Sequence, residues 1–178
     1  MKNKDIPILA FLNLLYLLVA CVAAELFTIL LIRFAIVFVE LDFAAASAVR
    51  LCSLFAISTG LFCLLGYKDG YRNACFTPSE AVPAVGLAAL AHWLICIPTR
   101  FSPWLAGATR HISGFLLLGS AYNSESRIKD IPFWGAVAVG FAMALLWAGL
   151  FLLAQYIGFR KRLRDRGVLT GESTQTQN

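Results

Sequence analysis

Charged residues are scarce in this chain, and their scarcity argues against most soluble functions. Of the 178 residues only 14% are charged and 60% are hydrophobic, whereas a soluble domain usually carries about 25% charged residues. The mean hydropathy is +0.75. This composition argues against a soluble enzyme and against a disordered chain. It predicts a small polytopic membrane protein whose first partner is the lipid bilayer.

The surplus of positive charge does not indicate a nucleic-acid partner. The net charge is +5, but five of the 15 lysines and arginines lie between residues 160 and 166. A cationic cluster directly after an apolar run is typical of a juxtamembrane segment on the cytoplasmic side. We therefore expect no binding to nucleic acid.

Motifs that carry catalysis or bind cofactors are also missing. The five cysteines form no CxxC pair, and the sequence contains no HExxH, nucleophile elbow, P-loop or GxGxxG motif. Because no set of acids, nucleophiles or metal ligands recurs at a useful spacing, we predict no catalytic residue, no metal and no cofactor. The sequence favours a non-enzymatic role.

Helix breakers are absent from a long N-terminal stretch, since no glycine or proline occurs between Pro7 and Gly60. A transmembrane helix needs about 20 apolar residues. We predict one all-α domain over residues 1–169, in which Asp42 separates the first two spans and residues 66–70 end the second with a turn. Residues 170–178 should form a disordered cytoplasmic tail. The predicted spans are 6–39, 43–65, 81–97 and 133–159.

A short apolar segment between the third and fourth spans is too short to cross a bilayer. Residues 106–120 are therefore expected to form a re-entrant or interfacial helix. Four spans place both termini on one side, and the cationic cluster makes that side cytoplasmic. We expect a multi-pass protein of the plasma membrane, specifically a bacterial inner membrane.

The N-terminus permits a second interpretation. Residues 18–21 read Leu-Val-Ala-Cys, which matches a lipoprotein cleavage box ending at Cys21. The chain stays apolar after this point instead of becoming polar. An uncleaved first helix is therefore favoured, and processing as a lipoprotein remains the alternative.

Three ionisable residues in the predicted spans are candidates for ligand binding or coupling. Glu25 and Arg33 lie about 80° apart around the first helix, and His92 lies in the third span. An ionisable group in a span is costly and by default suggests a function. For each residue the structural interpretation is nevertheless favoured, with Glu25 at the level of the outer headgroups and His92 bonded across helices. In the segment after the third span, Arg100, Arg110 and His111 are candidate contacts for an anion or a lipid.

Small residues recur at every fourth position in the last two spans, which favours close helix packing. We expect the third and fourth spans to pack on each other through these rows, although the partner could instead be a second copy or another membrane protein. The first helix resembles none of the others, so we predict no internal repeat. The positions with small residues are Ala84, Ala88, Ala136, Gly140, Ala144 and Ala148.

These observations leave two main hypotheses for the function. The favoured one is a non-enzymatic subunit or interaction partner of a membrane complex. The alternative is a carrier or channel component for a small solute or ion that uses Glu25, Arg33 and His92. A lipid-modifying enzyme at Arg100, Arg110 and His111 is a third hypothesis, but the sequence offers it no nucleophile or metal site.

Overall fold

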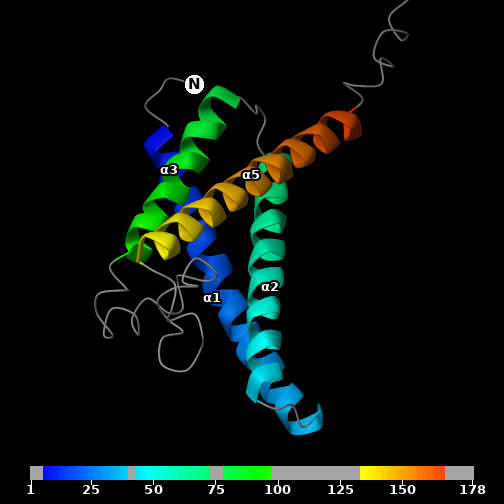
Figure 1. The fold of residues 1–178 in the computed structure, drawn as a ribbon. Coiled ribbons are helices and arrows are strands. Elements are labelled where there is room, and N and C mark those ends of the chain that lie inside the picture. The colour runs from blue at the N-terminus through cyan, green and yellow to red at the C-terminus, as the bar shows by residue number, and fades with distance from the viewer. Residues whose placement is uncertain (1–5, 40–42, 73–77, 98–132, 167–178) are drawn as a thin grey trace, which may run out of the picture.

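The computed structural model describes residues 6–39, 43–72, 78–97 and 133–166, and they form four α-helices (Figure 1). Each helix is long and apolar enough to cross a membrane, as the sequence predicted. The predicted helix at 106–120 and the tail at 170–178 lie outside these residues. The helices are α1 (Ile6–Val39), α2 (Phe43–Arg72), α3 (Pro78–Cys96) and α5 (Phe133–Asp165).

The four helices form a ring of neighbours. α1 packs against α2 and α3, and α5 packs against the same two helices. Consecutive helices α2 and α3 are therefore not the main partners of each other. The most extensive contact joins α2 to α5, which are far apart in the sequence and cross near the C-terminal end of α2 (Figure 1). Residue spacing in the sequence did not predict this contact.

The predicted end of α2 is wrong, because the helix continues through residues 66–70 to Arg72. The two glycines there are not turn residues but the points at which α5 comes closest. A Cβ atom at Gly66 would lie 2.8 Å from Cδ2 of Phe151, and one at Gly70 would overlap the carbonyl oxygen of Gln155. Glycine costs a helix about 1 kcal/mol relative to alanine. Here the absent side chain lets two backbones approach each other.

The expectation of no internal repeat is also wrong. Residues 60–72 read Gly-Leu-Phe-Cys-Leu-Leu-Gly-Tyr-Lys-Asp-Gly-Tyr-Arg, and residues 149–160 read Gly-Leu-Phe-Leu-Leu-Ala-Gln-Tyr-Ile-Gly-Phe-Arg. The two segments align when Cys63 is treated as an insertion. They lie in the C-terminal parts of α2 and α5, so the repeat relates the two helices that pack most extensively.

The structure uses the repeat symmetrically. A Cβ at Gly70 would meet the carbonyl of Gln155, and a Cβ at Gly158 would meet the carbonyl of Tyr67. Gly70 and Gly158 are equivalent positions of the repeat, and so are Tyr67 and Gln155. The equivalent phenylalanines, Phe62 and Phe151, stack on each other with centroids 4.4 Å apart and planes at 25°. The two helices therefore run in the same direction where they cross, and a local two-fold axis relates them.

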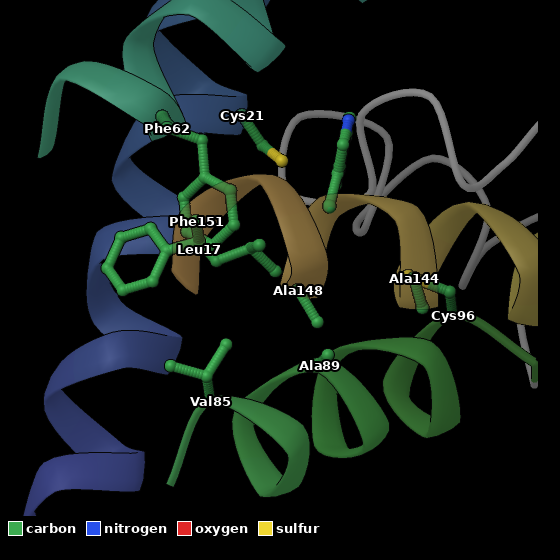
Figure 2. Close-up of a cluster of buried hydrophobic side chains, with 11 residues drawn as sticks. Leu17, Cys21, Phe62, Val85, Ala89, Cys96, Ala144, Ala148 and Phe151 are labelled. Carbon is green, nitrogen blue, oxygen red and sulfur yellow. The ribbon is translucent and has the colours of Figure 1, made fainter. Parts of the chain in front are cut away.

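All four helices contribute to one apolar core (Figure 2). Phe151 is completely buried at its centre, and small residues of α3 and α5 fill the space around it. Because these side chains come from every helix, the core fixes the ring of neighbours described above. The core residues are Leu17, Ala20, Cys21, Phe62, Val85, Ala89, Cys96, Ala144, Trp147, Ala148 and Phe151.

We predict that Gly70 and Gly158, the equivalent glycines at the crossing of α2 and α5, do not tolerate replacement by alanine. Gly70→Ala or Gly158→Ala should lower the free energy of unfolding by about 1–3 kcal/mol, because the new Cβ forces the backbones apart. Gly60→Ala and Gly149→Ala are matched controls, since they are also repeat equivalents but a Cβ there meets nothing within 4 Å. Thermal unfolding in detergent measures all four. Equal losses at the four positions would contradict the close approach.

Candidate functional site

The buried charge at the centre of α1 is neutralised by α2. Oε1 of Glu25 lies 2.8 Å from Nη2 of Arg50. Glu25 is 2% exposed, whereas the side chain of Arg50 is 23% exposed. A carboxylate this deeply buried needs a partner, and a guanidinium supplies both charge and a directed N–H donor. The pair therefore joins α1 to α2.

Sequence reasoning expected Arg33 beside Glu25, and the structure separates the two. Arg33 is exposed on α1, so the charged stripe along that helix does not form one buried group. Arg50 was missed as a partner, although it is the only charged residue among residues 43–65. A lone cation within an apolar run was the available signal, but the pairing depends on which helix faces α1.

Further polar groups follow the buried face of α1. Thr28, one turn after Glu25, is completely buried, and Asn13 is 3% exposed. Among the described residues, Oγ1 of Thr28 and Nδ2 of Asn13 have no hydrogen-bond partner. Buried polar atoms without partners are uncommon in proteins and mark places where water or a ligand can bind.

His92 lies inside the bundle, between α3 and α5. It is 1% exposed, and its ring lies 6.5 Å from that of Trp147, with the two planes at 23°. Nε1 of Trp147 donates a hydrogen bond to Oγ1 of Thr59, 3.0 Å away. The histidine therefore belongs to a packed group of rings that connects α3, α5 and α2.

The small residues of α3 and α5 lie mostly in the interior. Ala84 and Ala88 are buried on α3, and α3 contacts α5 through Trp93, whose Nε1 donates to the carbonyl of Val137 at 3.3 Å. The buried small residues of α5 are Gly140, Ala144 and Ala148. The side chain of Ala136, like Arg100, Arg110 and His111, lies outside the described part of the structure.

A second group of polar side chains gathers where α2 and α5 end. Nε2 of Gln155 donates to Oδ2 of Asp69 at 2.7 Å, and the hydroxyl of Tyr71 donates to Oδ2 of Asp165 at 3.2 Å. Nη1 of Arg162 donates to the carbonyl of Arg72 at 2.5 Å. Sequence reasoning took these cations only as topology anchors, and it placed the end of α2 about two turns too early.

Within residues 6–39, 43–72, 78–97 and 133–166, no group of three or more His, Cys, Asp or Glu side chains could hold a metal ion. The chain matches no family model, and no curated protein or solved structure is similar to it.

We predict that Glu25 and Arg50 stabilise the fold as a pair. Glu25→Gln should lower the free energy of unfolding by about 2 kcal/mol, because it leaves a partly buried guanidinium without its countercharge. Adding Arg50→Met should restore most of the loss. The control is Arg33→Met, which should change stability by less than about 0.5 kcal/mol at an exposed position. Thermal unfolding in detergent measures the stability of each variant. If the losses from Glu25→Gln and Arg50→Met simply add in the double variant, the two residues do not stabilise the fold as a pair.

Proposed function

We propose that this chain is a four-span membrane protein that acts without catalysis, as a subunit or interaction partner of a membrane complex. Four helices of sufficient length and apolar character support the membrane location. Large apolar side chains cover their outward faces, including Leu30, Phe34 and Phe38 of α1, which are 65%, 60% and 69% exposed. Such faces suit lipid or another apolar helix.

The orientation we propose places both termini in the cytoplasm and the bundle in a plasma membrane, that of a bacterial inner membrane. The parallel arrangement of α2 and α5 supports it, because their C-terminal ends lie together. Lys68 and Arg72 of α2 thereby join the cationic cluster at the end of α5. The positive-inside rule assigns such an end to the cytoplasm.

The observation that favours a subunit over a carrier is the ion pair between Glu25 and Arg50. A carrier that couples transport to a carboxylate needs that group available to an ion or proton. Here the acid of α1 is bound to a cation of α2 at 2.8 Å, and its contact stabilises the helix pair. A structural role in joining α1 to α2 is therefore sufficient to explain the buried carboxylate of Glu25.

The alternative remains a carrier or channel component that uses Glu25, Arg33 and His92. One observation favours it, namely that Thr28 and Asn13 bury polar atoms that have no hydrogen-bond partner among the described residues. They lie on the same buried face of α1 as Glu25. Water along this face would supply the missing hydrogen bonds of Thr28 and Asn13. Arg33, however, is exposed and does not lie on this face.

We predict that the outward face of α1 contacts another protein in the membrane. A photo-crosslinking residue at Leu30 or Phe34 should give a discrete adduct of defined mass, because a partner helix would cover that face. The buried Ala24, which is 0% exposed, is the control position and should give contacts within the chain only. Mass spectrometry of the adduct separates a second copy from another protein. Reaction with lipid alone would reject the subunit proposal.

We also predict that the interior of the bundle is closed to water. In a cysteine-free background, Thr28→Cys should react with a membrane-impermeant thiol reagent no faster than Leu17→Cys, since both positions are buried. Leu26→Cys, on the outward face of α1, controls for the depth of the position in the membrane. Rapid labelling at Thr28 alone would favour the carrier.

A further inference from the structure

The C-terminal ends of α2 and α5 line an open surface cavity in which arginines outnumber acids. Its volume is about 340 Å³, and residues of both helices line it. We propose that this cavity binds a phosphate group, as a phosphate diester of an anionic lipid headgroup or as free phosphate. The lining residues are Tyr71, Arg72, Arg162, Asp165 and Arg166.

The backbone holds the three arginines around one space. Arg162 and Arg166 are one helical turn apart, and N–H of Arg166 donates to the carbonyl of Arg162 at 3.1 Å, which extends the helical turn. Arg72 lies beside them at the end of α2, where its backbone carbonyl accepts a hydrogen bond from Nη1 of Arg162 at 2.5 Å. A guanidinium has five N–H donors in a planar fork. Arg162 therefore retains donors for a phosphate oxygen.

The charge of the cavity suits a monoanion. Three arginines and one aspartate line the cavity, and two helix C-termini each add about half a negative charge. The balance is a net charge of about +1, which a phosphate diester would neutralise. The hydroxyl of Tyr71 donates to Oδ2 of Asp165 at 3.2 Å, so one oxygen of the competing acid is already bound.

The position of the cavity matches the depth of a headgroup. It lies just after the apolar runs of α2 and α5, and Tyr71 lines it. The ring of Tyr71 stacks on that of Tyr67, with centroids 6.3 Å apart. Tyrosines gather at the membrane interface because their rings are apolar and their hydroxyls polar. This placement rests on the membrane location proposed above, and it favours the lipid diester over free phosphate as the source.

The same helix supplies cations that do not line the cavity. Arg160 lies over the ring of Tyr156, with its guanidinium carbon 5.8 Å from the centroid. Lys161 and Arg164 are exposed on α5 and take no part in the lining. They carry the same charge at nearly the same depth. A general attraction to anionic lipid would therefore involve them as much as the arginines of the cavity.

The test uses the full-length protein, delipidated in detergent, and native mass spectrometry with phosphatidylglycerol or phosphatidylcholine. Arg72→Gln with Arg166→Gln should weaken phosphatidylglycerol binding by at least about tenfold, because the phosphate loses two charge-assisted hydrogen bonds. Lys161→Gln with Arg164→Gln removes equal charge and should change it less than about threefold. Equal losses in both pairs, or no preference over phosphatidylcholine in the wild type, would overturn the proposal.

A gain of binding guards against loss through misfolding. Asp165→Asn removes the competing negative charge while keeping an acceptor for Tyr71, so it should strengthen phosphatidylglycerol binding at least about threefold. If Asp165→Asn does not strengthen binding, the result counts against the cavity as the binding site.

Inorganic phosphate is titrated in a separate experiment. Displacement of the lipid by millimolar phosphate assigns the cavity to the free ion, and no displacement assigns it to the lipid. Carbonate extraction of membranes reports membrane insertion independently, so failure of the membrane proposal is distinguishable.

Discussion

The close approach of α2 and α5 is the contact on which the rest of the bundle depends. Gly70 and Gly158 allow each helix to lie against a backbone carbonyl of the other. This approach brings Phe62 and Phe151 into stacking at the centre of the core. It also brings the two C-terminal ends together, so that Arg162 reaches the carbonyl of Arg72. Packing in the middle and polar contacts at the end therefore have one geometric cause.

The second constraint is the charge placed inside an apolar bundle. Glu25 is buried on α1, and a carboxylate in such surroundings must be paired or neutralised. Arg50 meets this requirement from α2, with its guanidinium 2.8 Å from the carboxylate and its side chain 23% exposed. The α1–α2 contact is thus fixed by an ion pair, whereas the α2–α5 contact is fixed by absent side chains. The two contacts share α2, which makes that helix the link between them.

Composition and hydropathy were enough to predict four helices and nearly all their starting points, because long apolar runs impose helices whatever their neighbours. Helix ends were less predictable. Residues 66–70 carry two glycines and polar side chains, which favour a turn when read locally. The structure keeps them helical because α5 contacts the glycines. The same limit applies to Glu25, since spacing along one helix relates it to Arg33, whereas the partner that forms comes from another helix.

The two repeat segments share the residues that pack against each other but differ in some of their polar residues. Their equivalent glycines and phenylalanines keep the symmetric contact, yet Asp69 of α2 corresponds to Ile157 of α5. Gln155 therefore donates to Asp69 with no second, symmetric bond. Arg72 and Arg160 are also equivalent, but Tyr156 holds Arg160 whereas Arg72 lines the cavity. A symmetric pair of helices thus ends in an asymmetric surface. The asymmetry comes from the few positions at which the repeats differ in polarity, and those positions flank the basic cavity.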